Sequence, residues 1–282
     1  MAVTAGGYGP PMAEIVYPPV IRTCLVAFKA LGMRFQMTGT DRIPDSGGVV
    51  LASNHVSYLD FIFAGLATWD TRRLTRFMAK DGVFKHPVSG PLMRGMHHIP
   101  VDREAGSASF RAALRALKDG EIVGVFPEAT ISQSFTVKEL KSGAVRMAAA
   151  ARVPIVPVVV WGGHRLWTKG RPRNLRLRGQ TISIAVGEPY TVGPRDDMDA
   201  ATTDLRSRLQ ALLDQAQAAH PATASPGPHA WWLPAHLGGG APTPQEADRL
   251  DALEVAERRS RREPQGSSAD PDDPATSGPA QA

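Results

Sequence analysis

The segment GVVLASNHVSYLD, residues 48–60, decides the fold class of this 282-residue chain. It begins with an apolar run at residues 48–53, which is typical of a short buried strand, and the pattern of residues 56–68 predicts a helix. His55 and Asp60 lie at the junction of the two. Because ligands of open α/β sheets bind beyond the carboxyl ends of the strands, this junction is a candidate functional site.

The same alternation of strand and helix patterns extends outward along the chain. We expect further strands at residues 74–79, 121–126, 154–161 and 181–186, and further helices at residues 107–117, 142–152 and 197–219. Strands that alternate with helices imply a mostly parallel sheet with helices on both faces. The sequence therefore predicts an α/β fold in a single domain over residues 16–220.

The two ends of the chain have a different composition. Residues 1–15 are rich in Gly and Pro, and we expect them to be disordered. Ten prolines fall within residues 221–282, which predicts a Pro/Gly-rich, largely disordered tail. Residues 244–262 could form a helix inside this tail, because acidic residues come early in it and arginines late.

An amphipathic helix is predicted within residues 16–37. Apolar residues recur there at spacings of three and four: Ile21, Leu25, Phe28, Leu31 and Phe35. Arg22, Lys29 and Arg34 add positive charge to the remaining surface. Two interpretations stay open, a helix packed on the domain core and a helix that lies in a membrane interface.

The charge of the chain is unevenly distributed. The total of 32 Lys and Arg against 27 Asp and Glu gives +5, but residues 221–282 hold nine acidic residues and five Arg, a net of −4. The remaining residues, 1–220, therefore carry +9, which indicates an anionic partner: nucleic acid, acidic lipid or a phosphorylated small molecule. Nucleic acid is disfavoured, because aromatic residues make up only 6% and do not alternate with the basic ones.

Cysteine count and hydropathy exclude other classes. Cys24 is the one cysteine in the sequence, so an internal disulfide and a Cys-based zinc site are ruled out. His86, His97 and His98 lack a recognisable metal-ligand spacing and are interpreted as surface or core residues. No segment is typical of a membrane-spanning helix or a secretory signal, so we expect a cytoplasmic location.

His55 and Asp60 form a possible acid–base pair. An imidazole can accept a proton from an attacking hydroxyl, and a carboxylate five residues later can fix its tautomer. No serine nucleophile is needed if the hydroxyl belongs to the substrate. This spacing is common, so the alternative of a histidine at a helix start beside an unrelated surface aspartate also stands.

Three later stretches strengthen the functional interpretation. Residues 95–103 end in a cation, Arg103, residues 125–130 contain a carboxylate, Glu128, and residues 153–158 form an apolar strand with two prolines. With the His-x4-Asp segment they make four blocks in order. Over about residues 35–190 the chain resembles the glycerolipid acyltransferase family, whose best-known members are the 1-acyl-glycerol-3-phosphate acyltransferases.

The resemblance implies a role for each matched residue. His55 would be the general base, and Asp60 would orient it. Four positions would bind substrate: Arg103 and Lys141 near the acceptor's phosphate, Glu128 where it helps to position the acceptor, and Thr130. Neither a metal nor a cofactor is implied, since acyl-CoA or acyl-carrier protein is a co-substrate.

Two residues depart from the usual third block, Phe-Pro-Glu-Gly-Thr-Arg. Ala129 replaces its glycine, which suggests a backbone that does not need positive φ. Ile131 replaces its arginine and removes a cation from the implied phosphate pocket. The departure leaves another lipid or glycolipid acceptor as an alternative.

The function implied is acyl transfer to the hydroxyl of a lysophospholipid in phospholipid biosynthesis. The favoured acceptor is 1-acyl-glycerol-3-phosphate, giving phosphatidic acid, and the expected location is peripheral, on the anionic cytoplasmic face of the cell membrane. Two other classes remain as alternatives. One is a thioesterase or lysolipid hydrolase that uses the same pair on water, and the other is a non-catalytic lipid-binding scaffold.

Overall fold

A seven-stranded sheet forms the centre of the computed structural model, which describes residues 14–102, 106–222 and 230–260. The strand order is β1-β7-β6-β2-β5-β3-β4, and every neighbouring pair is parallel except the antiparallel β6 and β7. The strands are β1 Arg34–Thr38, β2 Val49–Ser53, β3 Thr75–Lys80, β4 Ile99–Val101, β5 Ile122–Val125, β6 Ile155–Trp161 and β7 Thr181–Val186. The predicted single α/β domain with a mostly parallel sheet is confirmed.

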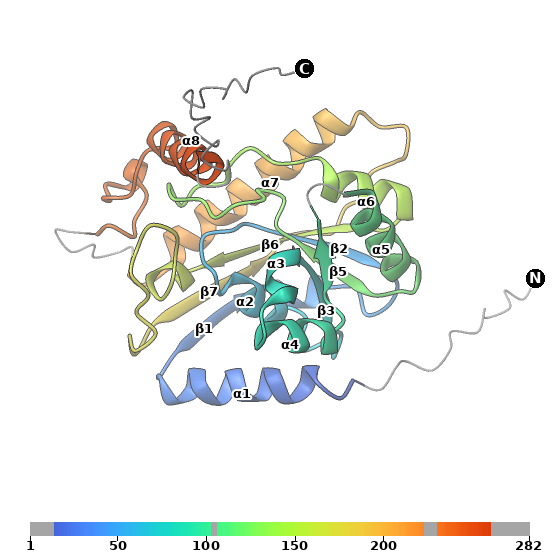
Figure 1. Ribbon diagram of the computed structural model, residues 1–282, viewed down its shortest axis with the longest axis horizontal. Helices are drawn as coiled ribbons and strands as arrows, with labels where there is room; N and C mark the ends of the chain where they lie inside the picture. Colours follow the sequence, from blue (N-terminus) through green and yellow to red (C-terminus); the bar gives the residue numbers. More distant parts are fainter. Residues whose placement is uncertain (1–13, 103–105, 223–229, 261–282) are drawn as a thin grey trace, which may run out of the picture.

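Eight α-helices are described, and those that pack on the sheet lie on both of its faces, whereas α8 lies away from the strands (Figure 1). They are α1 Tyr17–Ala30, α2 Asp60–Leu66, α3 Asp81–Lys85, α4 Ser89–Gly95, α5 Gly106–Lys118, α6 Gly143–Ala151, α7 Met198–Ala219 and α8 Pro244–Ser260. Three short 3-10 helices are η1 Thr40–Arg42, η2 Gly163–Arg165 and η3 Ala235–Leu237. The short α3 and α4 were not predicted from the sequence, whereas β4 lies in the stretch before Arg103 where the sequence indicated a strand.

Side chains of β2 alternate between two hydrophobic cores. Val50 and Ala52 point to the core that contains the buried faces of α5, α6 and α7. Val49 and Leu51 point to the core that contains the buried residues of α1 and α2. Because successive residues of a strand face opposite sides of a sheet, an unbroken apolar run is required when both sides are covered. This requirement explains why residues 48–53 decide the fold.

Pro157 lies inside β6 without breaking the sheet. All seven residues of β6 are buried, as its apolar run predicts. The register between β6 and β7 begins at Val158, so Pro157, which has no N–H to donate, lies just outside the residues paired with β7. The carbonyl of Pro157 instead accepts a hydrogen bond of 2.8 Å from the N–H of Gly187.

Helix α1 is shorter than the helix predicted for residues 16–37. It ends at Ala30, Gly32 has a φ of 65°, and residues 34–38 turn into β1, which pairs with β7. The prediction was wrong at this end because the helical spacing of Phe35 also fits a strand residue, and the pairing partner lies about 150 residues later. Phe28 and its apolar neighbours pack into the core, so the predicted stripe faces the domain.

Residues 230–260 correct the prediction of a largely disordered tail. Trp232 and Leu233 are buried in the core beside α7, and the carbonyl of Trp232 lies 2.9 Å from Nε2 of the buried His164. The Arg165 guanidinium lies 4.7 Å from the centre of the Trp232 ring. The proline-rich composition of the segment gave no sign that Trp232 and Leu233 would be buried. The helix suggested at residues 244–262 corresponds to α8. Residues 223–229 and 261–282, and most of the predicted disordered N-terminus, lie outside the described residues.

His98 gives the fold a dependence on acidic pH. Its Nδ1 accepts the N–H of Phe77 at 3.0 Å, and burial, with a smaller effect of Arg76, lowers the pKa of His98 to about 4. Since the unfolded chain takes up this proton near pH 6.5 and the folded chain does not, the free energy of unfolding should fall as pH drops through this interval. We expect His98 to account for a loss of roughly 2–3 kcal/mol between pH 7 and pH 4.5.

His98→Asn should reduce this loss, because the asparagine oxygen can accept the same N–H but cannot take up a proton in this range. Urea unfolding at the two pH values measures the difference. His236→Asn, at an exposed position, is the control and should behave as wild type. An unchanged pH dependence in His98→Asn would show that another group causes the acid sensitivity.

Candidate active site

Asn54 fixes the end of β2, where the candidate site begins. Its side-chain Nδ2 donates to the carbonyl of Val160 at 3.0 Å, and its Oδ1 accepts the N–H of Val160 at 2.8 Å. Asn54 is fully buried, so this pair of bonds ties the end of β2 to β6. The next residue, His55, is held through its carbonyl, which accepts the N–H of Ser132 at 2.7 Å. Sequence analysis did not identify Asn54, although it directly precedes the histidine.

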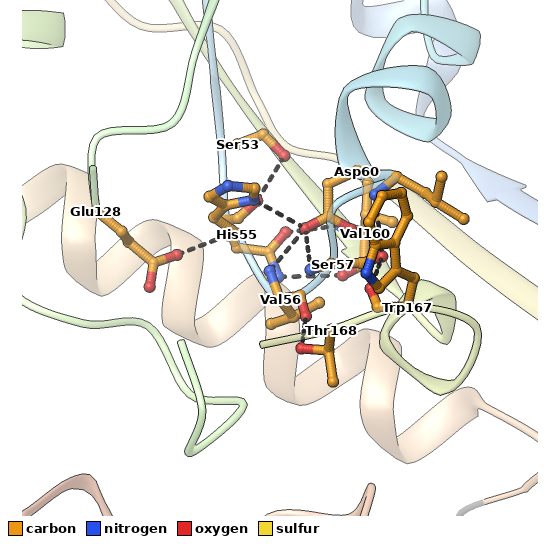
Figure 2. Close-up of polar contacts among 11 residues, drawn as sticks. Ser53, His55, Val56, Ser57, Asp60, Glu128, Val160, Trp167 and Thr168 are labelled. Atoms are coloured by element: carbon orange, nitrogen blue, oxygen red, sulfur yellow. Dashed lines mark hydrogen bonds and ion pairs between the residues drawn. The ribbon is translucent and has the colours of Figure 1, made fainter. Parts of the chain in front are cut away.

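Asp60 organises the turn between β2 and α2. Its Oδ2 lies 3.2 Å from His55 Nδ1 and accepts the N–H groups of Val56 and Ser57 at 2.6 Å each (Figure 2). The Asp60 side chain is fully buried, whereas 21% of the His55 side chain is exposed. Burial raises the pKa of Asp60, and the contacts with His55 and with the two N–H groups oppose this rise.

The geometry sets the tautomer of His55. A carboxylate that already accepts two N–H bonds favours a proton on Nδ1, which leaves the Nε2 lone pair as the acceptor. One face of the ring stacks on Phe126, with 4.3 Å between ring centres. The imidazole is therefore oriented from two directions and remains partly open to a substrate.

Glu128 lies on the other side of His55 from Asp60 (Figure 2). Its Oε1 accepts the N–H of His55 at 2.7 Å, and its Oε2 accepts the N–H of Lys138 at 3.0 Å. Glu128 is 4% exposed, and burial raises its pKa to about 8 despite these two donors. Both oxygens bind backbone, so the carboxyl group joins the loop after β5 to the His55 turn.

Two other predicted substrate-binding residues, Thr130 and Lys141, lie on the same loop. Thr130 Oγ1 accepts a hydrogen bond of 2.9 Å from Nζ of Lys138, a residue that sequence analysis did not single out. The side chain of Lys141 is exposed, and its backbone N–H donates to the carbonyl of Pro127 at 2.8 Å. Arg103 lies outside the described residues.

Ala129 contradicts the expectation drawn from its replacement of glycine. Its φ is 60°, so the backbone at this position is left-handed after all. An alanine in this conformation costs roughly 1–2 kcal/mol. The turn is closed by the N–H of Ala129, which donates to the carbonyl of Phe126 at 3.0 Å. The next departure, Ile131, is buried at 5% exposure.

The described part of the chain has neither a candidate membrane-spanning helix nor a cluster of metal-ligating side chains. No helix there combines the length and apolar character needed to cross a membrane. Nor do three or more His, Cys, Asp or Glu side chains gather there in a way that could hold a metal ion.

The fold and the site together define an α/β enzyme with a histidine–aspartate pair at the carboxyl end of its sheet. The Acyltransferase family model matches residues 34–161, which run from β1 to the end of β6 and include the pair. The chain is 30% identical over 188 residues to the 1-acyl-sn-glycerol-3-phosphate acyltransferase of Bacillus subtilis (strain 168), covering 62% of this chain and 87% of that protein. It thus belongs to the glycerolipid acyltransferase family, as an O-acyltransferase.

Two further relatives define the extent of the likeness. The 1-acyl-sn-glycerol-3-phosphate acyltransferase of Limnanthes douglasii is 31% identical over 157 residues, 52% of this chain, and the chain spans about half, 54%, of that plant protein. The crystal structure of the 1-acyl-sn-glycerophosphate (LPA) acyltransferase PlsC from Thermotoga maritima matches 71% of this chain and 79% of its own, with a TM-score of 0.57. At 22% identity, this structural match shows a shared fold.

Proposed function

We propose that this enzyme transfers a fatty acyl group from acyl-CoA or acyl-carrier protein to the hydroxyl of a lysophospholipid, with His55 as general base. The observation that carries the proposal is the His55–Asp60 pair, which leaves Nε2 of a partly exposed imidazole available. The favoured acceptor is 1-acyl-glycerol-3-phosphate, for which the Bacillus relative is named, and the product is then phosphatidic acid, in phospholipid biosynthesis.

The reaction follows from the orientation of the imidazole. Nε2 removes the proton of the acceptor hydroxyl while its oxygen attacks the thioester carbonyl carbon. The imidazolium that forms is stabilised by the buried Asp60 carboxylate across 3.2 Å. When the tetrahedral intermediate collapses, the C–S bond breaks and the sulfur leaves as a thiol with the proton from Nε2. Atoms and charge balance without a covalent enzyme intermediate.

An acceptor panel tests this function. Purified protein would be given radiolabelled palmitoyl-CoA with lysophosphatidic acid, glycerol 3-phosphate, other lysophospholipids or no acceptor, and the products would be separated by chromatography. We expect label in phosphatidic acid. Label in another lipid would keep the mechanism and replace the acceptor, whereas label in free fatty acid alone would favour a hydrolase.

The outward face of α1 suggests how the enzyme reaches a lipid acceptor. Arg22, Lys29 and Val26 are exposed there, and Val26 is 69% exposed. We propose that this face rests peripherally on the anionic cytoplasmic leaflet, to which each cation contributes about 1 kcal/mol. The proposal replaces the predicted apolar stripe, which faces the core, with the opposite side of the same helix.

Arg22→Glu/Lys29→Glu should weaken binding to vesicles of anionic lipid at least about tenfold, as measured by sedimentation. Arg115→Glu/Lys118→Glu on α5 makes the same change of charge at exposed positions and should have a much smaller effect. Equal losses in both variants would mean that the total charge of the protein, rather than α1, governs binding.

A further inference from the structure

Helix α8 lies outside the segment that matches the family, yet it contacts the loop that positions His55. Lys138 of this loop donates its backbone N–H to Glu128, whose other oxygen holds the N–H of His55. The ammonium group of the same Lys138 contacts Thr130 and Asp251 of α8. One lysine thus connects the candidate site with the C-terminal helix.

Two lysines from different loops bind the carboxylates of α8. Lys138 Nζ contacts Oδ2 of Asp251, and Lys169 Nζ contacts Oδ1 of Asp251 and Oε2 of Glu254. Gln133 adds a donor to Asp251 Oδ1 at 3.3 Å. Both lysine side chains are only 16% exposed, and that of Asp251 is 18% exposed. The carboxylate of Asp251 is therefore bracketed by two largely buried cations.

The inner face of α8 is electrostatic rather than apolar. Among the α8 side chains that the structure describes, Ala247 alone is buried, and Asp251 and Glu254 follow it at spacings of four and three on the same face. Leu250, Leu253 and Val255 are 42%, 62% and 50% exposed, so they do not anchor the helix. A helix held mainly by ion pairs can exchange its carboxylates for another anion at little cost in buried apolar area.

The helix is well formed in itself. Thr243 and Glu246 make a capping box, in which Glu246 Oε2 accepts the N–H of Thr243 at 2.8 Å and Thr243 Oγ1 accepts the N–H of Glu246 at 3.3 Å. Displacement from the lysines therefore does not require the helix to unfold.

We propose that Lys138 and Lys169 form a binding site for a phosphate group of the substrates, which Asp251 and Glu254 of α8 occupy as an internal competitor. This inference rests on the proposed function and adds to it a second phosphate site, which the carboxylates of α8 block in the structure. Two converging ammonium groups suit phosphate oxygens as they suit a carboxylate. Lys138 also brings positive charge next to Thr130, beside Ile131, which stands where the family pattern has an arginine.

The phosphate can come from the acceptor's headgroup or from coenzyme A, and binding experiments separate the two. Isothermal titration calorimetry with sn-glycerol 3-phosphate and with coenzyme A would compare wild type with Asp251→Asn/Glu254→Gln. If the α8 carboxylates fill the site about nine-tenths of the time, removing their charges should tighten binding of one ligand about tenfold. The ligand that gains affinity identifies the source of the phosphate.

Two control sets make the result specific. Asp248→Asn/Glu257→Gln removes two carboxylates from exposed positions of α8 and should leave both affinities unchanged. Adding Lys138→Met/Lys169→Met to Asp251→Asn/Glu254→Gln should abolish the gain. Glu254→Gln alone, which keeps the bracketed Asp251, should give a smaller gain and serves if the double variant folds poorly.

The proposal is overturned if Asp251→Asn/Glu254→Gln binds both ligands as the exposed-face control does, or if the gain persists without the two lysines. Binding is measured without turnover. A failure of the acyl-transfer assay would therefore refute the proposed function, whereas the calorimetry alone would decide whether the two lysines bind phosphate.

Discussion

His55→Ala is expected to lower kcat for acyl transfer by about a thousandfold or more, with the chain still folded. General base catalysis alone contributes roughly 10²–10⁴-fold, and the imidazole also returns its proton to the leaving sulfur. The substitution removes a partly exposed ring that stacks on Phe126. It leaves the two N–H bonds that Asp60 accepts from Val56 and Ser57, so the turn is retained.

The measurement compares kcat with lysophosphatidic acid in wild type and His55→Ala, and circular dichroism checks the fold. His236→Ala removes an exposed histidine and should match wild type in both respects. If His55→Ala kept most of its activity, another group would have to act as the base. Loss of secondary structure instead would mean that the ring supports the turn itself.

The proximity of His55 and Asp60 was easier to predict from the sequence than the packing around them. His55 and Asp60 are five residues apart, so the turn that unites them is local and the spacing alone suggests it. The structure places Glu128 beside His55, and this contact with the backbone of His55 depends on the pairing of β2 and β5. That pairing joins segments more than 70 residues apart, which no local pattern reveals.

The wrong predictions at β1, at residues 230–260 and at Ala129 also arise from contacts that the local sequence does not show. β1 becomes a strand because β7 pairs with it, although residues 34–38 also fit a helical spacing. Trp232 and Leu233 are ordered because the domain offers them an apolar site, not because their own segment has a regular pattern. Likewise, Ala129 has a left-handed φ because the chain makes a tight turn after Phe126. An alanine at this position does not indicate such a turn, whereas a glycine would have done. Local sequence patterns therefore predicted most strands and helices, whereas contacts between segments far apart in the sequence could not be predicted from them.

The second large effect is expected from substitution of Asp60, because its Oδ2 atom serves both catalysis and the stability of the fold. Oδ2 accepts the N–H groups of Val56 and Ser57 as well as facing His55 Nδ1. Asp60→Ala leaves two buried N–H groups without an acceptor, at roughly 1–3 kcal/mol each, so we expect a loss of about 2–5 kcal/mol in unfolding free energy together with the loss of activity. Chemical denaturation and the acyl-transfer assay measure the two losses.

Asp60→Asn separates the two roles. An asparagine oxygen in the place of Oδ2 can still accept both N–H groups, so the turn and most of the stability should remain, while the negative charge that stabilises the imidazolium is gone. The expected result is a folded variant with kcat reduced by roughly 10²–10⁴-fold. Were Asp60→Asn as active as wild type, the carboxylate would serve only as an acceptor for the turn. Were Asp60→Ala as stable as wild type, the two short N–H bonds would carry no net stability. We therefore expect Asp60→Asn to be stable and inactive, and Asp60→Ala to be unstable and inactive. Only this combination of results agrees with one buried oxygen that both holds the turn and supports His55 as the base.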